Sequence, residues 1–270
     1  MLSICAVMAV RNEAQYLRIL LPLLASQGID VAIIDNDSTD ESWQLYSEYR
    51  GNPVIRVETL PWLGYFSLLK QLEAKQKLYG DLKHDWLVHH APDEIMEHIN
   101  PNFKLRDAIQ EADASGNTVV NFDEFVFLPE PNSNYSGRNY YESICRYYFF
   151  EPSKHRLQRA WKRVSGLDSL LSGGHQLSGA KYSMYPTSHV LRHYIVLSSD
   201  HAKKKYLNRV YDPKDLEHGW HGNRLNFSEK NLELPQSSKF LIPLGENSPD
   251  LCKDVPSVKH YWEWGVRERE

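Results

Sequence analysis

Three clusters of polar residues in the first half of the chain carry side chains suited to binding and catalysis. They are Arg11-Asn12-Glu13, Asp35-Asn36-Asp37, and Asp93-Glu94 directly after His89-His90. An arginine and backbone N–H groups can hold a diphosphate, while carboxylates and amides hydrogen-bond a base or a ribose. Strand ends are polar in most proteins, so each cluster is weak evidence alone, but the three together predict a nucleotide site.

Each cluster follows a segment that is predicted to be a β-strand. These strands cover residues 4–10, 31–35 and 86–90, with a further strand at 54–58. Helical patterns of apolar residues lie between them, one after the first strand and another over residues 66–79. Such alternation is typical of a mostly parallel sheet covered by helices. The carboxyl ends of parallel strands meet at one edge, where ligands bind, so we expect the clusters to converge there.

The turns after the first two strands contain signals for helix starts. Asn12 is predicted to cap the first helix, and Ser38 with Glu41 has the spacing of a capping box. Further along, the pattern predicts a helix over residues 103–114 and a strand over residues 118–127.

Acidic and histidine side chains in later segments are candidates for proton transfer. Asp123 and Glu124 lie side by side in the strand predicted over residues 118–127, and alternation points only one of them into a site. His175 follows two glycines, which let the backbone approach a ligand while the imidazole acts as donor, base or metal ligand. His193 lies in a strand-like segment, although most of the 12 histidines must be surface or structural residues.

The second half of the chain is less regular. A strand is predicted at residues 190–198 and a basic helix at 200–210, whose lysines form a solvated face or hold an anion. The aromatic residues between 140 and 150, with Trp161, are either core or a platform on which sugars stack.

Composition excludes several classes of protein. The chain has 270 residues, 41% of them hydrophobic, which suits one large domain with appendages. A net charge of −4 argues against binding nucleic acid through bulk charge, and three scattered cysteines suggest neither disulfides nor structural zinc. The longest apolar run, residues 19–25, is too short to span a bilayer, and no secretory signal is evident. We therefore expect a cytoplasmic protein.

Several motifs in order resemble the family 2-like glycosyltransferases, which have the GT-A (nucleotide-diphospho-sugar transferase) fold. Residues 9–13, Ala-Val-Arg-Asn-Glu, resemble the family's opening strand and loop, and residues 34–40 resemble its second strand and acidic turn. Residues 89–94 are similar to a His-His-Asp-Ala-Asp-Glu stretch of one bacterial branch. Other motifs of that branch match residues 159–162, 172–175, 191–194 and 219–221, so the resemblance covers about residues 4–224.

The resemblance implies an α/β fold of the GT-A type, with a mostly parallel central sheet flanked by helices and a less regular acceptor side. It implies one domain over residues 1–225, with a nucleotide-binding half at 1–127 and an acceptor half at 128–225, and a C-terminal extension at 226–270. The implied activity moves a sugar from a nucleotide-diphosphate donor, most simply a UDP-sugar, to a saccharide or glycolipid acceptor. Surface polysaccharide synthesis, inversion at the sugar and peripheral membrane association are part of the same expectation.

The residues that match the family's pattern receive roles from it. Donor binding is assigned to Arg11, Asn12, Glu13, Asp35, Asn36 and Asp93, metal binding to Asp93 and His193, and catalysis to His175. Asp123 is added as a catalytic candidate from its place on the predicted strand, although the sequence does not fix which residue is the base.

The chain departs from the family at its metal-binding motif. The family's Asp-x-Asp element holds Mn²⁺ or Mg²⁺, but Ala91 stands at its first aspartate and leaves Asp93 and Glu94. Three alternatives stay open: metal held by Asp93 with help from Glu94 or a histidine, metal-free catalysis with Arg or Lys on the leaving phosphate, or nucleotide-sugar binding without turnover. A metal-dependent hydrolase is a rival of another class, which would use His89, His90, Asp93, His175 and His193.

Overall fold

The structure is a computed structural model that describes residues 2–163, 166–245, 251–265 and 268. In the first part of the chain the elements are β1 (Ile4–Val10), α1 (Ala14–Ser26), β2 (Asp30–Asp35), α2 (Ser42–Glu48), β3 (Val54–Thr59), α3 (Leu68–Asp81) and β4 (Trp86–His90). Then follow β5 (Glu94–Glu97), α4 (Leu105–Ala114), β6 (Val119–Phe127), α5 (Tyr140–Ser143), β7 (Arg146–Phe150) and β8 (Leu157–Lys162). The last part contains β9 (Leu167–Asp168), β10 (Ser178–Gly179), β11 (His189–His193), α6 (Ser199–Tyr206), α7 (Pro213–Glu217), β12 (Ile242–Pro243) and three short 3₁₀ turns.

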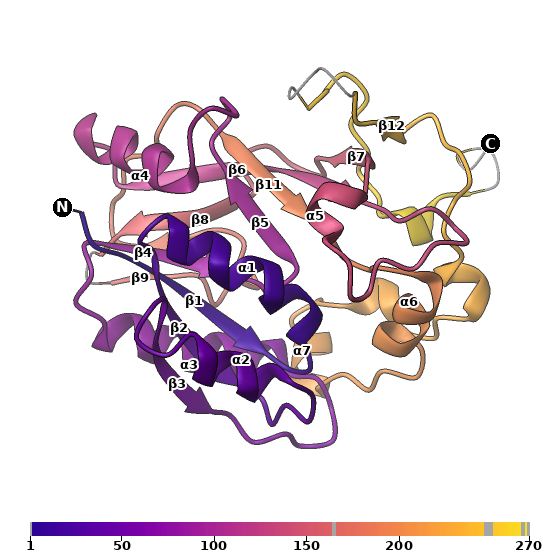
Figure 1. The fold of residues 1–270 in the computed structure, drawn as a ribbon, viewed down its shortest axis with the longest axis horizontal. Helices are drawn as coiled ribbons and strands as arrows, with labels where there is room; N and C mark the ends of the chain where they lie inside the picture. The colour runs from indigo at the N-terminus through magenta and orange to yellow at the C-terminus, as the bar shows by residue number, and fades with distance from the viewer. Residues whose placement is uncertain (1, 164–165, 246–250, 266–267, 269–270) are drawn as a thin grey trace.

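One mixed sheet runs through the centre of the molecule (Figure 1). Its order is β12-β7-β6-β8-β4-β1-β2-β3, with β11 beside β6 and β5 beside β11. β3, β2, β1 and β4 pair in parallel, β8 lies antiparallel between β4 and β6, and β11 is parallel to β6. These six strands, β1 to β4 with β6 and β11, therefore point the same way. The predicted α/β class with a mostly parallel sheet is confirmed.

Helices cover both faces of the first half of the sheet. Alternate residues of β1 enter two cores: Ala6 and Met8 pack with α1, while Cys5 and Val7 pack with Leu78 of α3. This follows from the period of two in a strand, which sends neighbouring side chains to opposite faces. Because both faces of β1 are buried, the strand is held rigidly. The start of the loop at its carboxyl end is therefore fixed in position.

The two predicted helix starts differ from the observed ones. Asn12 does not cap α1: its Oδ1 accepts from the backbone N–H of Thr39 (2.6 Å), and Asp40 Oδ2 instead accepts from the backbone N–H of Ala14 (3.0 Å). Ser38 does not begin α2, because its hydroxyl accepts from the backbone N–H of Asn12 (3.1 Å). Both capping side chains thus bond across to the neighbouring loop rather than within their own helix.

The second half of the chain uses its aromatic residues as core. Tyr140, Tyr147, Tyr148 and Phe149 are buried, as is Trp161, which decides against the sugar-stacking platform. Residues from the predicted C-terminal extension, among them Trp262 and Trp264, pack in one hydrophobic cluster with side chains of β7 and α6. β11 ends at His193, earlier than predicted, and the basic helix is α6. In the described ranges, no helix has the length and apolarity to cross a membrane.

Candidate active site

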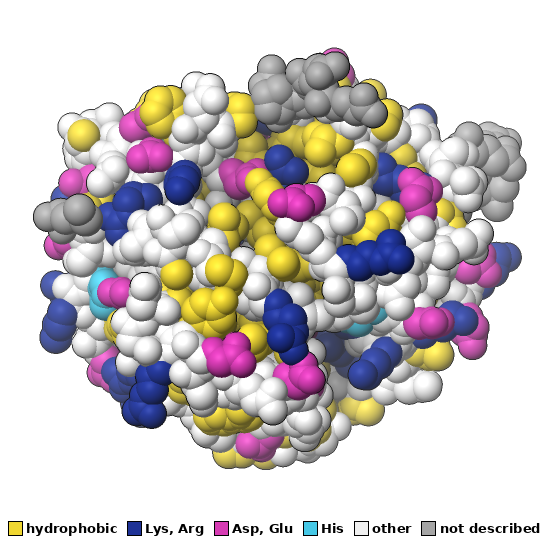
Figure 2. Space-filling model, viewed as in Figure 1, with side chains coloured by type: hydrophobic (Ala, Val, Ile, Leu, Met, Phe, Trp, Pro, Cys, Tyr) yellow, Lys and Arg dark blue, Asp and Glu magenta, His cyan; other side chains and the backbone are white. Residues whose placement is uncertain are grey.

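A cleft of about 1280 Å³ opens at the carboxyl ends of β1 and β2. Its walls are the loop after β1, residues 62–66, residues 134–137 and the side of α6. Basic and acidic side chains are interspersed on the face of the molecule shown in Figure 2. This cleft lies where the polar clusters were expected to converge.

The loop after β1 and the loop after β2 are fastened together by Arg11. Its guanidinium donates to the carbonyl oxygens of Asn36 and Asp37 and lies 3.9 Å from the centre of the Trp62 ring. Asp37 in turn accepts from the backbone N–H of Trp62 (2.6 Å). Arg11 and Trp62 both line the cleft, so a stacked pair of planar groups forms part of its wall.

Three predicted donor-binding residues are not in the lining of the cleft: Asp93, which is connected to it through Lys205, and Asp35 and Asn36, which lie beneath it. Asp35 is fully buried, with Oδ1 accepting from the backbone N–H of Ser38 (2.8 Å) and Oδ2 from the Tyr46 hydroxyl (2.8 Å). Asn36 is 4% exposed and donates to the Leu60 carbonyl (2.9 Å). These two side chains fix the shape of the loop that Arg11 holds, whereas Arg11, Asn12 and Glu13 line the cleft itself.

Glu13 combines a position in the cleft wall with a perturbed carboxyl group. Burial raises its pKa to about 7, although Lys205 nearby favours the charged form. Its Oε2 is buried and has no hydrogen-bond partner among the described residues. A carboxyl group in this state can exchange a proton near neutral pH.

A chain of charged side chains extends inward from the cleft wall. Lys205 of α6 donates to Asp93 Oδ2 (2.7 Å), and the same oxygen lies 3.5 Å from His193 Nε2. The other ring nitrogen of His193 lies 2.6 Å from Glu124 Oε1, and Glu124 also pairs with Arg156. This network of charged side chains joins residues of β11, β6 and α6 with the segment after β4 and the residue before β8, five separate parts of the sequence.

Protonation in this chain is set by its charges. Burial opposes a charge on His193, but Asp93 and Glu124 outweigh it and raise the pKa of His193 to about 10. Burial would likewise raise the pKa of Asp93, yet Lys205 and His193 hold that pKa well below its usual range. Burial lowers and Asp93 raises the pKa of Lys205, with a net increase. At neutral pH all three are therefore charged and paired.

The end of β4 is held by a second buried group. Lys75 donates to the carbonyl of His90 (2.8 Å) and lies 3.1 Å from His89 Nε2. Burial lowers the pKa of Lys75 to about 7. Gly174 packs directly on the His89 ring, where an added Cβ would come within 2.7 Å of Cε1, so this position needs glycine.

Comparison with known proteins finds a family match for the N-terminal part of the chain. Residues 5–68, which include β1, β2, β3 and the loops around the cleft, match the model of Glycosyl transferase family 2. The predicted resemblance to this family is confirmed for these residues, while the bacterial branch and the motifs after residue 68 stay predictions. No curated protein sequence matches the chain.

Solved structures show weaker similarities. The TarS crystal structure from S. aureus is 12% identical with a TM-score of 0.43 over 88% of this chain, which spans about half (48%) of the TarS chain. TarS 1–349 in complex with UDP is 13% identical with a TM-score of 0.42, over 87% of this chain and 70% of that one. A mannose-1-phosphate geranyltransferase from Thermus thermophilus gives a TM-score of 0.25 at 14% identity, over 61% and 51% of the two chains.

Family 2 glycosyltransferases often use a divalent cation, but the residues at the corresponding position here do not fit one. Ala91 offers no side-chain ligand, and Glu94 has committed both oxygens, to Arg159 (2.7 Å) and to the backbone N–H of Ala91 (3.2 Å). Asp93 and His193, the predicted metal ligands, lie together but are bonded to Lys205 and Glu124. A hard cation needs several free oxygen ligands, and this donor set offers at most one carboxylate oxygen.

The histidines of the rival hydrolase hypothesis do not assemble into a metal site either. In the described part of the chain, the group with suitable spacing is His98, Glu111 and His189, with ligand atoms within 4.8 Å. The Nδ1 atoms of these histidines accept from the backbone N–H groups of Asn100 (2.8 Å) and Ile99 (3.1 Å). Each ring then carries its proton on Nε2, which leaves no lone pair there for a cation.

The two predicted catalytic residues lie apart. Nδ1 of His175 lies 3.3 Å from Nη1 of Arg156, the arginine that pairs with Glu124. Burial together with Arg156 holds the pKa of His175 well below the usual range. Asp123 points to the opposite face of β6 and pairs with Lys253. Strand alternation therefore brings Glu124, the neighbour of Asp123, to the charged chain. The catalytic role of Asp123 stays a prediction that this placement does not support.

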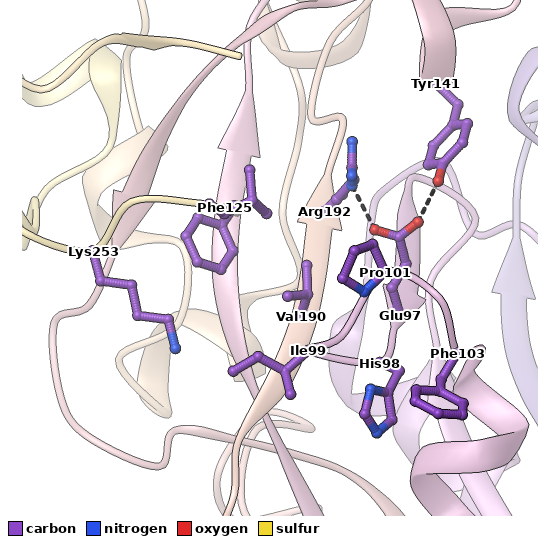
Figure 3. Close-up of a pocket in the computed structure, with 11 residues that line it drawn as sticks. Glu97, His98, Ile99, Pro101, Phe103, Phe125, Tyr141, Val190, Arg192 and Lys253 are labelled. Carbon is purple, nitrogen blue, oxygen red and sulfur yellow. Dashed lines mark hydrogen bonds and ion pairs between the residues drawn. The ribbon is translucent and has the colours of Figure 1, made fainter. Parts of the chain in front are cut away.

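The face of β6 that carries Asp123 has its own smaller cavity, of about 260 Å³ (Figure 3). Its charged groups are already paired: Arg192 donates to Glu97 (2.6 Å), Tyr141 bonds the same carboxylate, and Lys253 bonds Asp123. Phe125 and Val190 form apolar walls.

Three residues of the site escaped the sequence interpretation. Trp62 follows the third strand without a motif, and Arg156 lies in an irregular segment. Lys205 belongs to a basic run whose binding role was open, and its spacing in α6 places it on the opposite side of the helix from Lys203. Lys203 faces outward and pairs with Glu229, while Lys205 turns to Asp93.

Proposed function

We propose that this protein is a glycosyltransferase that binds a nucleotide-diphospho-sugar in the cleft beside α6 and transfers its sugar to a hydroxyl group of an acceptor. The observation that carries the proposal is a cleft whose walls combine the loops of the family 2 segment with cationic side chains of α6 and the residues after it. Arg11 and Trp62 offer planar surfaces, on which a nucleobase can stack. Lys204, Lys205 and Arg209 line the same cleft and suit a diphosphate.

The cations of the cleft are available to an anion. Lys204 is exposed and has no carboxylate within ion-pair distance among the described residues. The guanidinium of Arg209 packs over the Phe66 ring, 4.7 Å from its centre, which holds the charge at the cleft wall. Donor binding by Arg11, Asn12, Glu13 and Asp93, with Asp35 and Asn36 shaping the loop, is part of the proposal.

The chemistry requires a base for the acceptor proton and stabilisation of the departing diphosphate. We assign the first task to His175 on the family resemblance alone, because burial and Arg156, which lower the pKa of His175, keep its imidazole neutral but also make it a weak base. We further propose a UDP-sugar as donor, inversion at the anomeric carbon, and a saccharide or glycolipid acceptor of surface polysaccharide synthesis in the cytoplasm. These finer points rest on the family resemblance.

Isothermal titration with UDP, GDP, CDP, ADP and dTDP, followed by assays of the matching sugar nucleotides, tests the proposal. We expect one nucleoside diphosphate to bind, and Arg11→Ala to weaken it about 10-fold or more through lost stacking and loop support. Arg56→Ala is the matched control, since Arg56 lies in the same family segment but pairs with Glu58 and Asp81 outside the cleft. Failure of all five diphosphates to bind would refute the proposal. Binding without hydrolysis or transfer would favour the nucleotide-sugar-binding alternative.

A further inference from the structure

The ammonium group of Lys205 lies next to Asp93, at the position that a cation bound by Asp93 would take. Nζ lies 2.7 Å from Asp93 Oδ2 and 3.1 Å from the carbonyl oxygen of Ile195. The side chain is 10% exposed and passes over the Tyr16 ring, with Nζ 5.6 Å from its centre. These contacts fix a positive charge at one point of the cleft wall.

The position of Lys205 leaves it able to bind an anion. An ammonium group has three N–H donors, and among the described residues Asp93 and the Ile195 carbonyl accept two of them. Lys205 also lines the cleft, together with Lys204 and Arg209. The third donor is therefore available to a ligand oxygen in the cleft.

The helix that carries Lys205 is anchored on both sides of this point. The hydroxyl of Ser198 caps α6 by accepting from the backbone N–H of His201 (3.0 Å), and Tyr206 is buried in the C-terminal hydrophobic cluster. A lysine on a free surface would lose rotamer entropy on binding a phosphate, but here most of that cost is met during folding.

We infer that Lys205 stabilises the leaving diphosphate in place of a divalent cation, so that this chain binds its donor and transfers sugar without added metal; the inference rests on the proposed function. In the step itself, the bond between the anomeric carbon and the diphosphate oxygen breaks and its electron pair stays on the diphosphate. The acceptor oxygen forms the new bond to the anomeric carbon, and its proton passes to a base such as His175. Lys205 stays protonated and donates to the departing oxygen.

Calorimetric titration of the wild-type chain with UDP and with uridine, in EDTA and in Mn²⁺, tests the inference. We expect the same UDP affinity in both buffers. Lys205→Met should lower UDP affinity about 10- to 100-fold, the effect of one charge-assisted hydrogen bond, and leave uridine affinity unchanged. Lys205→Arg should restore part of the loss. Lys203→Met is the control, because Lys203 lies on the same helix and pairs with Glu229 away from the cleft.

The outcomes separate this inference from the proposed function. Loss of wild-type UDP binding in EDTA, with recovery in Mn²⁺, overturns the inference but leaves the proposed function standing. An equal loss of UDP and uridine affinity in Lys205→Met also overturns it, since Lys205 would then only support the fold. If neither UDP nor uridine binds in any buffer, the UDP-sugar donor is wrong; failure of the other four diphosphates as well refutes the proposed function, and the inference with it. If Lys205→Met does not fold, the wild-type comparison between EDTA and Mn²⁺ decides alone.

Discussion

The loops after β1 and β2 and the region around Asp93 are both rich in polar side chains. The two regions differ in the hydrogen-bond partners of these side chains. In the loops, side chains bond mainly to the backbone of the neighbouring loop: Asn12 to Thr39, Arg11 to Asn36 and Asp37. Around Asp93, side chains bond to side chains of opposite charge, as in the pairs Asp93–Lys205 and Glu124–Arg156.

This difference predicts how each region responds to mutation. Loss of a single neutral hydrogen bond costs little, since the freed groups at the cleft edge can bond to water. Removal of one charge from a buried ion-pair chain leaves its partners charged and without solvent, which costs several kcal/mol. The first region therefore tolerates change, while the second acts as one unit.

Neutralising Glu124 should have the largest effect on stability. Glu124→Gln leaves Arg156 and the protonated His193 without their buried carboxylate, so we expect a loss of about 3 kcal/mol or more in the free energy of unfolding. Urea denaturation measures it. Asp123→Asn is the matched control on the other face of the same strand: its pair with Lys253 is more exposed, and we expect a loss below about 1 kcal/mol. Equal losses would contradict the contrast between the two faces.

The same contrast explains what the sequence could predict. The motif residues of the first two loops, such as Arg11, follow recognisable strands, and their partners lie in the next loop of the same family segment. The network of charged side chains around Asp93 joins residues up to 112 positions apart in the sequence. Pairing of β11 with β6 and packing of α6 bring these residues together. A local sequence pattern does not show which face of the sheet a given strand residue points to. It therefore could not decide which of the neighbours Asp123 and Glu124 faces the site, since a shift of one residue exchanges the two.

Glu13 lies at the border between the two regions. The raised pKa of its carboxyl group should make the stability of the protein depend on pH. Its folded-state pKa of about 7 exceeds the usual 4.5, so the folded chain binds the proton more tightly than the unfolded chain. Stability should therefore be greatest below about pH 4.5 for this group and fall as pH rises through 7, by an amount on the order of 3 kcal/mol. Glu13→Gln should remove this fall, measured as melting temperature against pH relative to wild type. A parallel pH profile in the variant would contradict the assignment.

Asn12 offers the smallest test, confined to the loop region. Its φ is 58°, in the left-handed region, and its Oδ1 accepts from two backbone N–H groups, of Thr39 (2.6 Å) and Asp40 (3.3 Å). Asn12→Ala loses these bonds and adds backbone strain, for about 1–2 kcal/mol in total, whereas Asn12→Gly loses only the bonds. Urea denaturation should therefore rank wild type above Gly and Gly above Ala. If Asn12 capped α1 instead, as its sequence position predicts, the loss would come mainly from the cap and Gly would cost only a few tenths of a kcal/mol. A variant with Gly at this position that matches wild type would thus restore the cap interpretation and remove the cross-loop bonds from the account of this region.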